Sequence, residues 1–181
     1  SFDKANKVEY MQIIQKDETK TSGWAFTNKA GKCFTEAFGL TDSEDAQQQV
    51  IWGLIQYKDN SVKLPTGVTA TAATAAKIDL ALSKVAALTG FKALTDKTKI
   101  EVSEAGIYAI KAEEEGYTYK TATAYVGFGE PYPALSGTEV IAKKSSTSVD
   151  KTTEDADHVV AIGDIVTYKI EAYVPFIDAA N

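Results

Sequence analysis

Arginine is missing from this sequence. All 19 basic residues in the 181-residue chain are lysines, and 25 acidic residues outnumber them. Arginine is the usual side chain for bidentate binding of phosphates and base edges. The formal net charge of −6 also opposes association with a polyanion. These two features argue against a nucleic-acid-binding protein.

Cysteine and histidine are almost absent too, with one residue of each, Cys33 and His158. A single cysteine excludes an internal disulfide, and a single histidine excludes a metal site built from several histidines. Histidine is also the commonest general base near neutral pH, so most hydrolase constellations are excluded. Catalysis by carboxylates or lysines alone stays open on composition, but no clustered acid pair is evident. We therefore expect neither enzymatic activity nor a metal or cofactor.

Long apolar runs are lacking as well. No stretch approaches the length needed to span a bilayer, and no signal peptide opens the sequence. We expect no membrane contact by this chain, with any targeting segments lying outside it. Hydrophobic residues still make up 44% and aromatic residues 10%, which is enough for a folded core. The length suits one domain with an appendage, or two small domains.

The first half of the chain carries two helical patterns. Residues 41–57 open with a capping box, in which Thr41 is the expected N-cap and Glu44 follows three residues later. Apolar residues then recur at helical spacing, at Ala46, Val50, Ile51, Leu54 and Ile55. A second helix is predicted to end at Gly90, where a C-terminal cap belongs. Its apolar side consists of Ile78, Leu82, Val85 and Leu88.

Residues 7–14 form a mixed apolar run that suits a strand, and 24–26 are a second, short candidate. From residue 99 onward strand patterns with a period of two dominate, at 99–103, 106–114, 120–129, 138–144 and 165–175. In the last of these, Val166 and Tyr168 face one way while Thr167 and Lys169 face the other. We predict a mainly β fold, a β-sandwich into which two helices are inserted.

The last strand also carries a resemblance to a known family. Its opening, GDIVTY at residues 163–168, resembles the strand that begins an immunoglobulin-like domain in the sortase-assembled pilins of Gram-positive bacteria, the isopeptide-forming fimbrial proteins. The earlier sequence is similar to a pilin N-terminal domain, with an EYMQII strand, an alanine-rich helix and a GIYAI hairpin. The resemblance implies that residues 1–144 form that immunoglobulin-like domain. Residues 145–181 would then begin a second, incomplete immunoglobulin-like domain of the isopeptide type.

The resemblance implies a structural function without enzymatic activity. The chain would belong to a pilus (fimbrial) subunit that sortase polymerises covalently on the cell wall of a Gram-positive bacterium. Its partners would be other pilin subunits and sortase, and its location extracellular. A position in the shaft, at the tip or at the base stays open, because VIAKK at residues 140–144 replaces the family's Tyr-Pro-Lys motif.

Three lysines carry this hypothesis. Lys143 and Lys144 stand at the end of the first domain, so both are candidate sortase-linkage residues. Lys151, in SVDKTT, stands where the family has the lysine of an intramolecular isopeptide bond. We expect that bond to be absent from this chain, since no asparagine is suitably placed. The long strand from residue 165 is predicted to pair with residues 148–153 or with a neighbouring molecule.

An adhesin module that binds a host glycan or matrix protein is the alternative function. Tyrosines near the hairpin and the turn after it would form its binding surface, namely Tyr117, Tyr119, Tyr125 and Tyr132. Strand-flanking tyrosines are also common in ordinary β-sandwiches. Trp52 follows Ile51 on the apolar flank of the first helix, so we expect it in the core and not in a sugar-stacking platform.

Three further motifs are better explained by local structure. LPTG at residues 64–67 lacks the residue that separates proline from threonine in the sortase signal, so we interpret it as a turn. Cys33 and the glutamines at 47–49 are similar to the Cys-Gln thioester of some Gram-positive adhesins, where the two residues lie much further apart. We expect a free, partly buried thiol instead. The carboxylates at 113–115 are expected to be solvated, since no calcium-loop pattern surrounds them.

Overall fold

The described part of the chain is mainly β, as predicted. The computed structural model describes residues 4–97, 99–131, 133, 138–146 and 165–173, with the backbone alone for 138–141 and 165–173. Nine strands and three helices form within these ranges. In chain order they are β1 (Lys7–Lys16), β2 (Trp24–Phe26), α1 (Ala30–Ala37), α2 (Glu44–Lys58), α3 (Ala75–Val85), β3 (Lys92–Ala93), β4 (Lys99–Glu101), β5 (Gly106–Glu114), β6 (Tyr117–Tyr119), β7 (Ala122–Val126), β8 (Thr138–Ser146) and β9 (Ile165–Tyr173).

All nine strands belong to one open sheet. The order along its main path is β2-β1-β5-β6-β8-β9-β4, while β3 adds to β1 and β7 adds to β5. The pairings are antiparallel, except that β4 and β9 run parallel. That parallel pair joins two segments that lie far apart in the sequence.

The central strand β5 is buried on both faces. Its first five residues, 106–110, are all buried. Ile107 and Ala109 belong to one core cluster, which we call the helix-side core. Tyr108 and Ile110 belong to another, which we call the second core. The continuous apolar run in GIYAI is the pattern of a strand that is covered on both faces.

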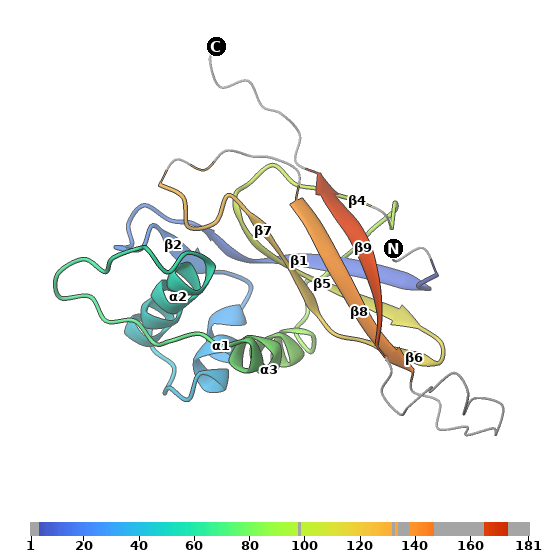
Figure 1. Cartoon of the computed structure of the whole chain (residues 1–181), viewed down its shortest axis with the longest axis horizontal. Helices are drawn as coiled ribbons and strands as arrows, with labels where there is room; N and C mark the ends of the chain where they lie inside the picture. Colours follow the sequence, from blue (N-terminus) through green and yellow to red (C-terminus); the bar gives the residue numbers. More distant parts are fainter. Residues whose placement is uncertain (1–3, 98, 132, 134–137, 147–164, 174–181) are drawn as a thin grey trace, which may run out of the picture.

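Three helices cover one face of the sheet, and Figure 1 shows them gathered beside β1 and β2. The helix-side core joins Phe34 of α1, Ile51 of α2 and Leu82 of α3 to apolar residues of β1, β2 and β5. Trp24 and Trp52 lie in the same core. The prediction that Trp52 is a core residue is therefore confirmed.

The second core lies on the opposite face of β5. In it, Val8 of β1, Ile110 of β5 and Val126 of β7 meet residues of two distant strands, Ile100 of β4 and Ala142 of β8. The part of the sheet that contains β4, β8 and β9 therefore lies across the face of β1 and β5, as Figure 1 shows for β8 and β9. Two layers of strands enclose this core, and the helices pack outside them.

Helix α1 is a third helix where the sequence predicts two. No side chain caps its N-terminus: Lys29 occupies the N-cap position with left-handed backbone, at φ 65°. Gly31 lowers the helix propensity of its first turn. The usual signals for a helix start are therefore missing, and Phe34, buried in the helix-side core, holds the helix in place.

The N-terminus of α2 differs from the predicted capping box. The helix begins at Glu44, and Ser43 is its N-cap, with a side-chain oxygen that accepts from the Ala46 amide at 3.0 Å. The prediction of Thr41 as N-cap is therefore wrong by two residues. Ser43 is a better capping residue than Thr41, but the glutamate three residues after Thr41 favoured the wrong position.

The C-terminus of α3 also differs from prediction. The helix ends at Val85, and turn residues lead from there to Gly90. In this segment the Ala87 amide bonds to the Lys84 carbonyl and the Leu88 amide to the Val85 carbonyl. These bonds to the third preceding residue replace α-helical bonding and end the regular helix.

The last strand, β9, joins the sheet through β8 and β4. It pairs with β8 from Thr138–Ala172 to Ser145–Ile165, and with β4 on its other edge. Its predicted partner, residues 148–153, lies outside the described residues. The predicted boundary between residues 144 and 145 falls inside β8. That residues 145–181 begin a second domain stays a prediction.

Candidate functional site

Lys144 is a charged residue inside the protein. Its side chain is 2% exposed, and that of Glu114 beside it is 10% exposed. Burying an ammonium costs several kcal/mol unless a partner compensates the charge. Buried charges of this kind occur in structural ion pairs and in functional sites. The surroundings of Lys144 therefore define the candidate site.

Three strands bring the partners of Lys144 together. Its Nζ atom lies 2.9 Å from Oε1 and 2.8 Å from Oε2 of Glu114, at the end of β5. Tyr119 of β6 is opposite Lys144 in the strand register, and its hydroxyl donates to Glu114 Oε1 at 2.9 Å. The ring centre of Tyr117 lies 4.0 Å from Nζ, which adds a cation–π attraction. We call these four residues the Lys144 cluster.

Strand alternation places both charges on the inner face of the sheet. Successive side chains of a strand point to opposite faces, so residues two apart share a face. Glu114 shares the face of Tyr108 and Ile110 on β5, and Lys144 shares that of Ala142 on β8. Those three neighbours lie in the second core. The Lys144 cluster is thus the end of the second core, where apolar contacts give way to an ion pair.

The electrostatics of the cluster favour the charged pair. Burial works to raise the pKa of Glu114, but hydrogen bonds from Lys144 and Tyr119, together with the Lys144 charge, hold that pKa below its ordinary value. Burial and then the hydrogen bond to the Glu114 carboxylate raise the pKa of Tyr119 to about 12. The Glu114 carboxylate therefore accepts hydrogen bonds from Lys144 and from the neutral Tyr119 phenol. This is the arrangement of a structural ion pair.

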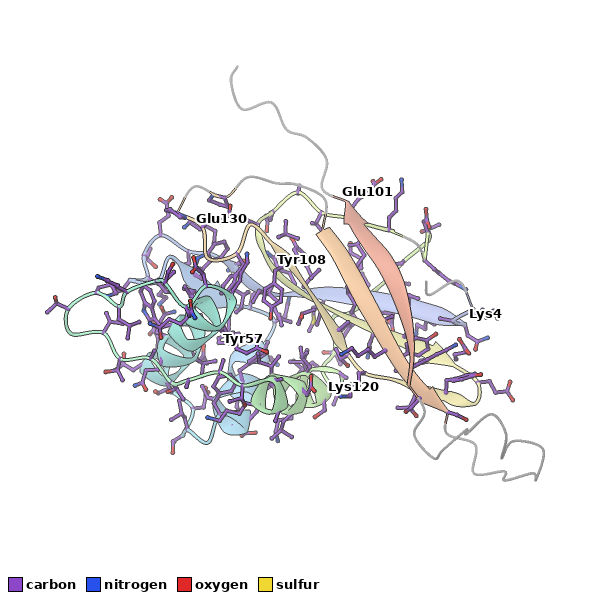
Figure 2. All side chains as sticks on the ribbon, viewed as in Figure 1. Lys4, Tyr57, Glu101, Tyr108, Lys120 and Glu130 are labelled. Atoms are coloured by element: carbon purple, nitrogen blue, oxygen red, sulfur yellow. The ribbon has the colours of Figure 1, made fainter. Side chains whose placement is uncertain are left out.

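Lys143 precedes Lys144 on β8 and lies on the opposite face, where it is exposed. Its carbonyl accepts from the Lys120 amide at 2.9 Å, and on the other edge it pairs with Thr167 of β9. Figure 2 labels Lys120 beside the lower end of β8. The strand therefore presents one lysine to solvent on a backbone that is bonded on both edges.

The structure separates the three lysines that the sequence predicts as site residues. Lys143 is accessible and Lys144 is enclosed in the Lys144 cluster, whereas Lys151 lies outside the described residues. The expectation that the carboxylates at 113–115 are solvated is wrong for Glu114, whose side chain is 10% exposed and paired with Lys144. Glu114 follows Ile110 by four residues, so strand alternation places both on the inward face of β5. That position is a signal that could have identified Glu114.

The tyrosines of the alternative function divide between two places. Tyr117 and Tyr119 belong to the Lys144 cluster. Tyr125 packs against the helix-side core, with its ring centre 6.1 Å from that of Phe128. Tyr132 lies outside the described residues. Tyr119 and Tyr125 are therefore occupied by the ion pair and by packing, whereas Tyr117 contacts Lys144 but remains 38% exposed.

Cys33 and Gln47 line one hollow beside α1. The thiol is free and buried, with its sulfur 3.9 Å from the Lys29 carbonyl, while the Gln47 amide donates to Asp42 at 3.0 Å. Burial and then the charge of Glu36 raise the pKa of Cys33, which keeps the thiol protonated and poorly nucleophilic. The expectation of a free thiol is confirmed, and the thiol is buried where partial burial was expected.

Comparisons with known proteins add no relative. A scan against protein-family models, a search of curated proteins and a search of solved structures each returned no match. Within the described ranges, no helix is long and apolar enough to cross a membrane. The same residues contain no group of three or more His, Cys, Asp or Glu side chains placed to hold a metal ion.

The first prediction concerns the ion pair itself. Replacement of Glu114 by Gln leaves the Lys144 ammonium buried without a counter-charge, so we expect the free energy of unfolding to fall by about 3–5 kcal/mol. Chemical denaturation at neutral pH measures this loss. The control Glu115→Gln, at the exposed neighbouring position, should change stability by less than about 0.5 kcal/mol. Equal effects of the two substitutions would contradict the assignment.

The second prediction concerns pH. The pKa of Glu114 is depressed in the folded state, so its stabilising contribution is complete above its ordinary value of 4.5. The contribution is lost as the pH falls through the folded-state value. The stability difference between the wild-type protein and Glu114→Gln should therefore shrink when denaturation is repeated below pH 4.5. A difference that stays constant would show that Glu114 is not an ionised, stabilised carboxylate.

Proposed function

We propose that the chain is part of a pilus subunit, a non-enzymatic structural protein that sortase joins to other pilin subunits, and that Lys143 is the acceptor lysine. The observation that carries the proposal is the difference in exposure between two adjacent lysines of β8. Lys143 is exposed, whereas the side chain of Lys144 is 2% exposed and paired with Glu114. A sortase must reach the amine that it acylates, so accessibility favours Lys143. The pilin resemblance at residues 163–168 supports the same class of protein.

The mechanical setting of Lys143 suits a covalent junction. A force applied at this side chain enters β8, which is hydrogen-bonded to β9 along one edge and to β6 near its end. The Lys144–Glu114 pair then connects β8 directly to β5, the strand that both cores bury. A junction at Lys143 would therefore transmit load into the best-buried part of the fold.

The finer fold assignment belongs to the same proposal. We infer an immunoglobulin-like arrangement for residues 1–144, and we infer that residues 145–181 lead into a second such domain. The two packed strand layers around the second core support the sandwich, and the GDIVTY resemblance supports the second domain. In this reading the protein lies outside the cell, in the pilus or cell wall of a Gram-positive bacterium, and Lys151 keeps its role as the candidate isopeptide lysine.

The third prediction tests the acceptor. Incubation with a pilus-forming sortase and a peptide that carries the sorting motif should give a branched peptide at Lys143, located by tandem mass spectrometry. Lys143→Ala should abolish the product, because the neighbouring Lys144 amine is enclosed. Lys120→Ala, which removes another exposed lysine beside β8, is the matched control and should leave the yield unchanged. A branch at a different lysine, or undiminished product from Lys143→Ala, would refute the proposal.

A second candidate function, an adhesin module that binds a host glycan or matrix protein, is favoured by a different observation. A hollow of about 420 Å³ opens beside Tyr10 and Tyr108, away from the tyrosines that the sequence singled out. An array of glycans and matrix proteins distinguishes this function from a purely structural one, because a structural subunit should bind none of them tightly.

A further inference from the structure

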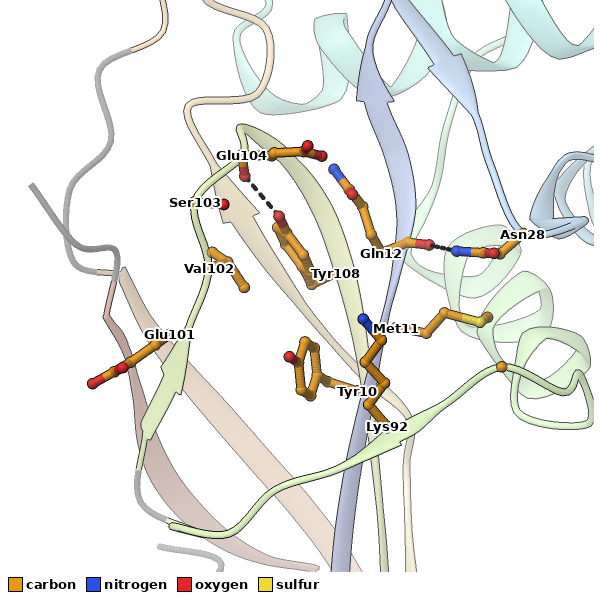
Figure 3. Close-up of a pocket in the computed structure, with 11 residues that line it drawn as sticks. Tyr10, Met11, Gln12, Asn28, Lys92, Glu101, Val102, Ser103, Glu104 and Tyr108 are labelled. Carbon is orange, nitrogen blue, oxygen red and sulfur yellow. Dashed lines mark hydrogen bonds between the residues drawn. The ribbon is translucent and has the colours of Figure 1, made fainter. Parts of the chain in front are cut away.

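A hollow lies where β1 and β5 meet the segment that joins β4 to β5. Its volume of about 420 Å³ falls in the usual range of small-molecule sites. Strand β1 supplies one wall, β5 a second, and the segment 101–104 a third, as Figure 3 shows. The side chains that matter below are Tyr10, Gln12, Asn28, Lys92, Glu104 and Tyr108.

The backbone is irregular at several points around this hollow. In β1, Gln12 pairs with Tyr108 and Ile14 pairs with Ile107, so Ile13 is an extra residue that forms a β-bulge. Asn28 has a left-handed backbone, at φ 55°, a conformation that asparagine adopts more readily than most other non-glycine residues. Bulges and left-handed residues of this kind are enriched beside functional sites, where they redirect side chains.

A glycine makes the bulge possible. Gly106 has φ 153°, and a Cβ atom at this position would lie 2.0 Å from the Ile14 carbonyl oxygen. The Gln12 amide nitrogen fills the space beside this glycine, donating to the carbonyls of Ile14 and Ala105 at 3.3 Å each. The irregular backbone therefore aims Gln12 at one end of the hollow and holds it there.

Two other wall residues are fixed by hydrogen bonds as well. The Asn28 amide nitrogen donates to the Gln12 carbonyl at 2.9 Å, and the Tyr108 hydroxyl donates to the Glu104 carbonyl at 2.7 Å. Both bonds are drawn in Figure 3. The side-chain oxygens of Gln12 and Asn28 have no hydrogen-bond partner among the described residues. Acceptors of fixed position therefore line the hollow and stay available to a ligand.

The charges around the hollow are balanced and peripheral. Lys92 and Glu104 are both exposed, and Figure 3 shows them toward opposite ends of the hollow. Glu101, also at the rim, is paired with Lys99 at 3.3 Å. The groups held in fixed positions, by contrast, are amides and phenols. The hollow therefore favours a neutral ligand with many hydroxyl groups over an ion.

We propose that this hollow binds a neutral saccharide of one or two rings. The sugar hydroxyls donate to the side-chain oxygens of Gln12 and Asn28 and to the Glu104 carboxylate, and they accept from the Lys92 ammonium. The half-buried ring of Tyr10, whose centre lies 6.5 Å from that of Tyr108, offers an apolar face to the C–H face of the sugar. The inference rests on the second candidate function, glycan binding at this hollow, and it is independent of sortase linkage, which has its own readout at Lys143.

Saturation-transfer NMR followed by calorimetric titration tests the proposal. The probes are the methyl glycosides of glucose, galactose, mannose and N-acetylglucosamine, the disaccharides lactose and N-acetyllactosamine, and diglycine as a zwitterion of similar size. We expect at least one saccharide to bind with Kd of about 1 mM or tighter, and diglycine to give no signal. Binding by none of the saccharides, or by diglycine alone, overturns the proposal.

Variants locate the binding. Tyr10→Leu keeps apolar bulk but removes the aromatic face, and it should weaken binding about three- to tenfold. Glu104→Ala removes an exposed carboxylate that makes no hydrogen bond or ion pair among the described residues, so folding should be preserved while affinity falls about three- to tenfold. Tyr57→Leu, at a 51% exposed tyrosine of α2, is the matched control and should bind as the wild-type protein does. Wild-type affinity in Glu104→Ala and in any folded Tyr10→Leu protein would place the saccharide elsewhere and refute the assignment.

Discussion

The ion pair between Lys144 and Glu114 is the interaction on which the C-terminal half of the sheet depends. It joins β8 to β5 across the intervening strand β6. A slip of β8 by one residue would turn the other face of the strand inward. In one direction Ser145 would take the place of Lys144 and leave Glu114 without a cation, whereas in the other direction Lys143 would take that place. The ion pair therefore opposes the first slip, and the burial of Ala142 in the second core marks the native inward face. A buried ion pair is weak evidence for added stability, but it contributes to the choice of register.

The second constraint is the burial of β5 on both faces. A strand whose consecutive residues are all apolar cannot border solvent on either side. The helices cover the face of Ile107 and Ala109, while β4 and β8 cover the face of Tyr108 and Ile110. Glu114, the last residue of β5, lies on the inner face but is charged. Its charge therefore needs a buried partner, and Lys144 provides it.

Local sequence patterns predicted much of this fold. The period-two segments at 106–114 and 138–144 correspond to β5 and β8, and the helical pattern that includes Val50 and Ile51 corresponds to α2. These features depend on the spacing of apolar side chains along the chain, which can be seen in the sequence. Helix α1 was missed although Ala30, Cys33, Phe34 and Ala37 recur at helical spacing, because the helix is only eight residues long and has no capping side chain. The bulge at Ile13 was missed because only the pairing with β5 defines an extra residue.

The candidate site was less accessible to sequence analysis. The pattern could name Lys143 and Lys144 but not distinguish them, because the choice depends on which face of β8 is covered. The strands that provide the cover, β5 and β6, meet β8 through long-range pairing that no local pattern encodes. The hollow beside Tyr10 depends on the same kind of information, since Asn28 and Glu104 come together only in the folded chain.

The central claim is that two neighbouring lysines differ sharply in access because one is locked inward by a carboxylate. Competitive acylation of the folded protein by a small amine-reactive ester, with tandem mass spectrometry to separate the two positions, tests it most directly. Lys143 should react at the rate of an exposed lysine such as Lys7, and Lys144 should react at least about tenfold more slowly, since its amine must first escape a buried ion pair. Equal rates at Lys143 and Lys144 in the folded state would contradict the account.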